Sequence, residues 1–238
     1  MKKTVLAFFV FGGAVVYWNI ARPQADSSGR VAAALRDLGV DLLCLAEVNP
    51  LRKRREAPFV ETVEPQLPGY RRLASTAHIG LWVGARIGSQ LEIVSSRREY
   101  LKVAWGFDLD LRWRGRPLRV LVVDFDSAPS TTRTRAMGPL REWVERQTAP
   151  WLVIGDFNMP SNSRALASLF PGHHPSWPRT GQGWGPTFPR EWPLARIDHV
   201  LEGPGVEVTM LRTVDPGLSR HSLQTMTVVP RNGDSPIR

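Results

Sequence analysis

The sequence is poor in cysteine and in lysine, and both shortages narrow what the chain can be. Its 238 residues include one cysteine, Cys44, which excludes an internal disulfide and a metal cluster held by cysteines. The lysines are limited to Lys2, Lys3, Lys53 and Lys102, so arginine carries most of the net charge of +9. Because the planar arginine head suits phosphate, nucleic acid, another phosphorylated substrate and an anionic membrane are all reasonable partners. A genome that favours arginine codons would give the same composition.

The sequence also lacks a hydrophobic run of the about 20 residues that a transmembrane helix needs. Residues 4–18 form an apolar run after two lysines, broken by a pair of glycines. This start resembles a signal peptide or anchor, so membrane association through residues 4–18 stays open, but no small-x-small cleavage motif follows. The other interpretation is two strands, 5–11 and 14–20, joined by a turn at the glycines. A cytoplasmic location is favoured, with anchoring or export as the alternatives.

Length and composition predict a single domain over residues 1–229, with 1–13 as the signal-like or anchor segment and 230–238 as a tail. We expect a monomer. Strands outnumber helices, which favours two packed sheets covered by helices over a doubly wound parallel sheet. The predicted strands are 14–20, 41–48, 78–83, 91–94, 103–113, 118–125, 151–154, 195–201, 206–213 and 222–229. The predicted helices are 30–38, 134–147 and 164–170.

Residues 151–160 read WLVIGDFNMP, the stretch around which we expect the site to form. Four apolar residues predict a short buried strand that ends at Gly155. If the chain stays extended, Asp156 and Asn158 point the same way and Phe157 points into the core. A carboxylate and a carboxamide side by side at a strand end can hold a water or a phosphate oxygen. The same residue types are also common in simple turns.

Polar residues recur at the ends of the other apolar strands. A carboxylate such as Glu47 in this position is costly to desolvate unless it meets a cation or hydrogen-bond donors. Together these residues predict one polar cleft at a common edge of two sheets. They are Asn19 in VVYWNIA, Glu47 in LLCLAEV, Asp124 and Asp126 in VLVVDFDS, Asp198 and His199 in RIDHVL, and Ser219 and His221 in LSRHSLQ. Since His199 alternates away from Asp198, we expect it to face the core or a sheet face.

In their order along the chain, these pieces resemble the endonuclease/exonuclease/phosphatase superfamily of DNase I-like and AP-endonuclease-like enzymes. The motifs are WNIAR, LAEV, VLVVDFDS, VIGDFNMP, the TFP of residues 187–189, RIDHVL and SRH; GDFN followed by IDH is the most specific. The resemblance implies a four-layer α/β sandwich of two mostly antiparallel sheets with helices on both outer faces. It also implies a hydrolase of phosphodiesters or phosphomonoesters that uses Mg²⁺ or Mn²⁺, with a nuclease among the candidates. Its partner would be a phosphate-containing substrate, with DNA and RNA among the candidates.

The resemblance assigns metal binding to Glu47 and Asn19, and catalysis to Asp156, Asn158, Asp198 and His221. Elementary chemistry agrees with these assignments. The hard carboxylate oxygens of Glu47 suit Mg²⁺. Asp156 can take a proton from water, and His221, held protonated by Asp198, can stabilise the phosphate.

The sequence departs from the family pattern at two positions. The closing Ser-Asp-His motif is Ser-Arg-His at 219–221, so Arg220 stands where an aspartate would contribute to the metal site. This arginine either weakens Mg²⁺ binding or holds phosphate directly. Asp124 replaces a histidine, and the two changes predict an Asp124–Arg220 ion pair across the cleft. Both residues join Asn19 as candidate substrate-binding groups. The alternative function is a non-catalytic member of the fold that binds phosphate or nucleic acid.

Two further stretches allow two interpretations each. The basic run 51–57 is expected to be a solvated charge run, with a phosphate-binding patch as the alternative. Residues 171–193 are rich in glycine, proline and tryptophan and predict a long loop. We interpret its aromatic residues as a plug over the sheet edge. They could equally contact a nucleic-acid base, a lipid or a sugar.

Overall fold

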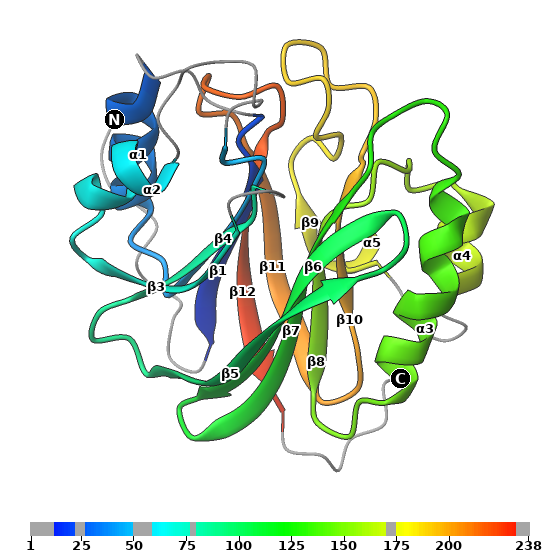
Figure 1. Ribbon diagram of the computed structural model, residues 1–238, viewed down its shortest axis with the longest axis horizontal. Coiled ribbons are helices and arrows are strands. Elements are labelled where there is room, and N and C mark those ends of the chain that lie inside the picture. Colours follow the sequence, from blue (N-terminus) through cyan, green and yellow to red (C-terminus); the bar gives the residue numbers. More distant parts are fainter. Residues whose placement is uncertain (1–11, 22–26, 50–58, 77–79, 170–174, 232–238) are drawn as a thin grey trace.

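The structure is a computed structural model that describes residues 12–21, 27–49, 59–76, 80–169 and 175–231 (Figure 1). Several predicted features lie outside the described residues. These are the strand 5–11, the basic run 51–57, the start of the strand 78–83, the last residue of the helix 164–170, the start of the loop 171–193, and most of the tail 230–238.

Two β-sheets form the centre of the molecule and face each other across an apolar core. The seven-stranded sheet has the order β3-β4-β2-β1-β12-β11-β9, and the five-stranded sheet has the order β10-β8-β7-β6-β5. Antiparallel pairs predominate, and β1–β2, β9–β11 and β7–β8 are parallel. The predicted pair of mostly antiparallel sheets is therefore confirmed.

The strands of the larger sheet are β1 (Gly13–Asn19), β2 (Leu42–Ala46), β3 (Tyr70–Ser75), β4 (Trp82–Arg86), β9 (Gly181–Gln182), β11 (Val206–Val214) and β12 (Leu223–Pro230). Those of the smaller sheet are β5 (Leu91–Tyr100), β6 (Ala104–Trp113), β7 (Arg116–Phe125), β8 (Trp151–Asp156) and β10 (Asp198–Glu202). The helices are α1 (Ser28–Leu38), α2 (Phe59–Thr62), α3 (Met137–Glu145), α4 (Arg164–Leu169) and α5 (Trp177–Thr180). Short 3-10 turns at Glu64–Gln66 and Arg133–Ala136 follow α2 and precede α3.

Helices cover the outer face of each sheet, which makes the four layers that the sequence predicted. Figure 1 shows α1 and α2 on one side of the molecule and α3 and α4 on the other. Val31 and Leu35 of α1 share an apolar cluster with strands β1, β2 and β4 of the larger sheet. Leu140 and Trp143 of α3 share another cluster with β7 and β8 of the smaller sheet.

Strand β1 is buried on both faces and therefore holds its last residue rigidly. Side chains alternate along a strand, so Val15 and Tyr17 enter the core between the sheets while Val16 and Trp18 pack beneath α1. Burying each of the larger side chains contributes about 1.5–3 kcal/mol. The strand ends at Asn19, at the edge of the sheet where the site lies.

Two edge strands were missed or shortened in the prediction from sequence. Strand β3 was not predicted, and β5 extends well beyond the predicted 91–94. Both are edge strands whose polar side chains face solvent, so neither shows clear apolar alternation. The stretch 171–193, predicted as a loop without structure, contains α5 and the two-residue strand β9. Both elements are too short for any periodicity to show.

No helix in the described part of the chain is long and apolar enough to cross a membrane. The predicted signal-like or anchor segment falls mainly on residues 1–11, which are not described. The second half of the same apolar run forms β1, as the strand interpretation of 14–20 predicted.

The pairing of β7 with β8 requires a glycine at position 155. A Cβ atom on Gly155 would lie 2.1 Å from the carbonyl oxygen and 2.6 Å from Cγ2 of Val123 on β7. We expect Gly155→Ala to lower the free energy of unfolding by about 1–3 kcal/mol, because backbone on the paired strand must move to make room. Chemical denaturation measures this change. Gly138→Ala, in open space on α3, is the matched control and should not destabilise the protein. Equal stability of Gly155→Ala and the wild type would contradict the tight approach of the two strands.

Candidate active site

Three aspartates stand side by side across neighbouring strands of the smaller sheet. Asp156 ends β8, and the strand register pairs it with Asp198 on β10 and with Asp124 on β7. Residues that are directly opposite on paired strands lie on the same face of the sheet. Asp156 and Asp198 are fully buried, and Asp124 is half-buried. The register therefore concentrates carboxylates at one edge of this sheet.

Asn19 connects this edge to the larger sheet. Its Nδ2 atom donates hydrogen bonds to Oδ2 of Asp156 at 3.0 Å and to Oε1 of Glu47 at 3.2 Å. Its Oδ1 atom accepts a hydrogen bond from the backbone N–H of Ala21 at 2.9 Å. The amide nitrogen therefore faces the acidic residues and orients both carboxylates.

Glu47 and Asn158 both adopt the left-handed backbone conformation, with φ angles of 50° and 48°. This corrects the expectation that the chain stays extended from Asp156 to Asn158. The chain turns at Asn158, whose N–H donates to Oδ1 of Asp156 at 2.7 Å and whose Nδ2 donates to the carbonyl of Phe125 at 2.7 Å. Phe157 does enter the core as predicted. The turn residues and the site residues are thus the same residues. A left-handed backbone at a residue other than glycine costs of order 1–3 kcal/mol, which the surrounding contacts must offset.

His221 is buried beside two aspartates and is held as a cation. Its Nδ1 atom lies 3.1 Å from Oδ2 of Asp198 and 3.8 Å from Oδ2 of Asp156. Burial alone would lower the pKa of His221, but the charge and hydrogen bond of Asp198, then Asp156 and Glu47, raise the pKa to about 9. Because Nδ1 is engaged with Asp198, Nε2 remains as the ring nitrogen that a substrate can reach.

Asp156 is a buried carboxyl group with little solvent around it. Burial, followed by the charge of Asp198, raises the pKa of Asp156 to about 8, although His221 and the donors from Asn158 and Asn19 lower it. Extra positive charge near this group favours its ionised form.

Several residues without a predicted role hold the His221 segment in place. The Ser219 hydroxyl donates to the carbonyl of Asn19 at 2.7 Å and accepts the N–H of His221 at 3.0 Å. The indole N–H of Trp18 donates to the carbonyl of His221 at 3.1 Å. Buried Thr187, from the TFP motif, accepts the N–H of Asp198 at 3.4 Å. Their signal was already in the sequence, since each lies within a family motif, but only the fold reveals what they contact.

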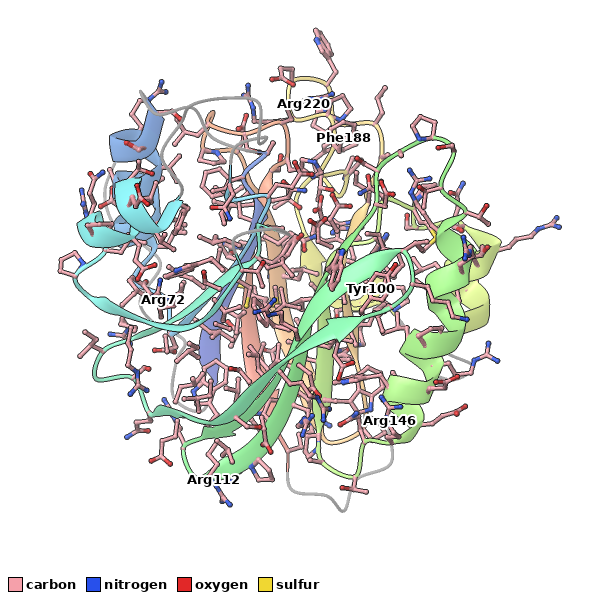
Figure 2. The ribbon with its side chains drawn as sticks, in the orientation of Figure 1. Arg72, Tyr100, Arg112, Arg146, Phe188 and Arg220 are labelled. Carbon is pink, nitrogen blue, oxygen red and sulfur yellow. The ribbon has the colours of Figure 1, made fainter. Side chains whose placement is uncertain are left out.

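Arg220 points away from the three aspartates. Its side chain is exposed, and its guanidinium carbon lies 5.1 Å from the centroid of the Phe188 ring, as Figure 2 shows near the edge of the molecule. The other side of the Phe188 contact is His221, with the two ring centroids 4.8 Å apart. Among the described residues no ion pair joins Arg220 to Asp124, so the predicted pair is wrong. The hydrogen bond from Arg190 N–H to the carbonyl of Arg220 fixes the backbone here.

His199 lies in the core, as its alternation with Asp198 predicted. Its Nε2 atom donates to the carbonyl of Met159 at 2.8 Å. Burial first, and then the charge of Arg196, lower the pKa of His199 to about 4 in spite of that hydrogen bond. This histidine is therefore neutral at physiological pH.

The tryptophans of the loop beside the site do not form the predicted plug. Trp184 and Trp192 are 69% and 79% exposed, and Leu194 is 82% exposed. The indole N–H of Trp184 donates to the carbonyl of Pro193 at 3.1 Å, which orders the loop. Only Trp177 of α5 packs against the core. The exposed aromatic groups are free to contact a substrate.

The acidic edge has the ligand chemistry that a divalent cation requires. Carboxylate oxygens of Glu47, Asp124 and Asp156 lie within 4.8 Å of one another. Ligand atoms of Asp156, Asp198 and His221 also lie within 4.8 Å of one another, but a hydrogen bond already joins Nδ1 of His221 to Oδ2 of Asp198. A site of hard oxygen ligands fits Mg²⁺ or Mn²⁺.

The raised pKa of His221 depends on Asp198. We expect Asp198→Asn to lower the pKa of His221 from about 9 to near or below the usual 6.5, because burial then outweighs the remaining anions. NMR titration of the imidazole C–H signals measures this shift. His199 is the internal control and should keep a pKa well below 6.5 in both proteins. An unchanged pKa of His221 would show that the pair does not set its charge.

The sequence profile of the endonuclease/exonuclease/phosphatase family matches residues 16–221. A member of that family from Bacteroides vulgatus is similar in structure, with a TM-score of 0.75 and 16% identity over 92% of this chain and 99% of that chain. A mannosyl-6-phosphatase from Bacteroides thetaiotaomicron gives a TM-score of 0.72 and 13% identity over 91% and 99% of the two chains. TDP2 of D. rerio, complexed with single strand DNA product, gives 0.71 and 12% over 91% and 98%.

A search of curated proteins gives no match. The likeness to solved structures shows the fold, since their identities are low. The family profile spans the motifs that carry the site, from WNIAR to the histidine at 221. The protein therefore belongs to the endonuclease/exonuclease/phosphatase family.

Proposed function

We propose that this protein is a divalent-metal-dependent hydrolase of phosphodiesters or phosphomonoesters. The observation that carries the proposal is the convergence of Asp156, Asp198 and His221 with Asn19 and Glu47 at one edge of the two sheets. Phosphoester hydrolysis needs a base for water, a cation or donor for the phosphate oxygens and a stabilised leaving group. These residues offer each of the three.

The divalent cation, held by Glu47 and neighbouring carboxylates, would neutralise charge on the phosphate oxygens. Asp156 is the group that accepts a proton from the attacking water. Its orientation is fixed by Asn19 on one oxygen and by the N–H of Asn158 on the other. Asn19 therefore acts by positioning the carboxylates of the site.

His221 supplies positive charge on the other side of the phosphate. Asp198 holds Nδ1, so the Nε2–H can donate to a phosphate oxygen. Asn158, beside Asp156, lies where a further contact to the phosphate can form, and the exposed Arg220 over Phe188 can contact a neighbouring phosphate of the substrate. The planar guanidinium of Arg220 suits two phosphate oxygens at once.

A nucleic acid is the substrate class that we favour. The net charge of +9 attracts polyanions, and two exposed tryptophans stand beside the site. TDP2 of D. rerio, a structural neighbour, was solved with single strand DNA product. Against this, the mannosyl-6-phosphatase has the same fold, so small phosphomonoesters belong in the same screen.

The second candidate function is phosphate or nucleic-acid binding without turnover. Arg220 is the observation that favours it, because the family pattern has an acidic residue at this position. Binding in the presence of EDTA without hydrolysis would support this alternative.

We expect the purified protein to hydrolyse at least one substrate among plasmid DNA, abasic DNA, single-stranded RNA, a sugar phosphate and a generic bis-phosphodiester, with Mg²⁺ or Mn²⁺. EDTA should abolish this activity. Asp156→Asn and His221→Ala should each lower kcat by about 10²–10⁴-fold, the usual contribution of a group that transfers a proton. Steady-state rates measured on the substrate that is turned over provide the test.

Asp37→Asn on exposed α1 is the control for the loss of one carboxylate and should keep the wild-type rate. Hydrolysis that survives EDTA, or that Asp156→Asn leaves intact, would contradict the proposed chemistry. No turnover of any substrate together with binding in EDTA would support the non-catalytic alternative.

The exposed tryptophans allow the substrate class to be tested separately. If single-stranded nucleic acid stacks on the loop, Trp192→Ala should raise KM by about 5–100-fold and change kcat less, because stacking on an aromatic side chain contributes about 1–3 kcal/mol per base. Trp105→Ala, on β6 against Tyr100, removes an indole elsewhere and should leave KM unchanged. Equal KM values for the two variants would show that this loop does not bind the substrate.

A further inference from the structure

The register of β7 and β8 brings two carboxyl groups face to face. Asp124 lies directly across from Asp156 on a parallel neighbouring strand. Like charges at directly opposite positions destabilise a sheet. Asp198 flanks Asp156 from the other side, but it has His221 as its cationic partner. The row therefore holds a third carboxyl group, Asp124, beyond the two aspartates that lie next to His221.

Glu47 brings a further carboxylate to the same point from the other sheet. It follows β2 directly, and its Oε1 accepts a hydrogen bond from Asn19, which also binds Asp156. The result is that oxygens of Glu47, Asp124 and Asp156 lie within 4.8 Å of one another. Three carboxylates from three strands and two sheets are brought together in the folded chain.

A buried tyrosine beneath the row is an independent sign of a missing partner. Tyr17 on β1 is 1% exposed, and its hydroxyl has no hydrogen-bond partner. Burial first, and then the charges of Asp198, Asp156 and Asp124, raise the pKa of Tyr17, and Tyr17 lies two residues before Asn19 on the same face of β1. The backbone N–H of Asp156 lowers the pKa of Tyr17, but it does not meet the geometry of a hydrogen bond to the hydroxyl. A buried hydroxyl without a hydrogen-bond partner destabilises the fold, and a ligand or its water at this edge would supply that partner.

The arginine at position 220 takes no part in this cluster. Its guanidinium lies over Phe188 at the surface, and its backbone carbonyl accepts the N–H of Arg190. Position 220 therefore offers the cation neither a carboxylate nor a competing positive charge in direct contact.

We propose that Asp124 is a direct ligand of the divalent cation, together with Glu47 and Asp156, and that it supplies the carboxylate which the family pattern places at residue 220. The proposal rests on the proposed function for the presence of a cation. It revises the sequence assignment of Asp124 to substrate binding, since a carboxylate repels phosphate unless a cation lies between them. It also explains how Arg220 can be present without destroying the metal site.

The test is Mn²⁺ binding to the full chain after EDTA treatment, measured by electron paramagnetic resonance or calorimetry without substrate. Asp124→Asn should weaken Mn²⁺ binding at least about tenfold, because one charged oxygen ligand is lost. Asp126→Asn is the matched control. It removes the same charge two residues away, where the carboxylate accepts hydrogen bonds from Ala128 N–H and the Thr131 hydroxyl instead.

Thermal unfolding of the same proteins provides a second readout. In EDTA, the melting temperatures of the wild type and of Asp124→Asn give the two metal-free references. With Mn²⁺, the wild type should gain more in melting temperature than Asp124→Asn, since only binding to the folded state stabilises it. Asp124→Ala serves as a second variant and should lose Mn²⁺ binding in the same way.

Equal Mn²⁺ affinities of the wild type and both Asp124 variants would overturn the proposal, as would a wild type that binds no Mn²⁺. An equal loss in Asp126→Asn would also overturn it, because net charge alone would then explain the effect. If the wild type binds Mn²⁺ through Asp124 but hydrolyses no phosphoester, the proposed function fails and the cation site stands. If hydrolysis depends on the metal but not on Asp124, the proposed function stands and this ligand assignment fails.

Discussion

Electrostatic repulsion among carboxylates is the constraint that organises this protein's candidate site. Strands β10, β8 and β7 place Asp198, Asp156 and Asp124 in one row, and Glu47 approaches from the facing sheet. Such a row is unfavourable in isolation and becomes favourable when positive charge is shared among its members. The surrounding groups can be understood as sources of that positive charge or of hydrogen-bond donors.

Different groups offset the negative charge of different carboxylates in the row. His221 neutralises the Asp198 side, and Asn19 donates to Asp156 and Glu47. These partners come from β1 and from the segment before β12, which are adjacent strands of the larger sheet. The two sheets must therefore pack in one relative position before the charges balance. This links the apolar core between the sheets to the chemistry at their edge.

The sequence predicted the fold well because its motifs occur in the family's order, and it placed every buried strand that carries a site residue. Edge strands β3 and β5 were missed or shortened, since their exposed polar residues leave no apolar alternation. The conformation of Asn158 was mispredicted because φ depends on hydrogen bonds to Asp156 and Phe125 rather than on residue type. The orientation of the Arg220 side chain could not be predicted from the sequence either, because its contact with Phe188 depends on how two distant loops meet.

A crystal structure of the protein grown with Mn²⁺, with anomalous scattering recorded at the manganese edge, tests the central claim most directly. The account predicts one strong anomalous peak at the sheet edge, in contact with carboxylate oxygens of Glu47, Asp124 and Asp156, with Arg220 outside its coordination. A peak elsewhere in the molecule, or an acidic edge without bound manganese at saturating concentration, would contradict it.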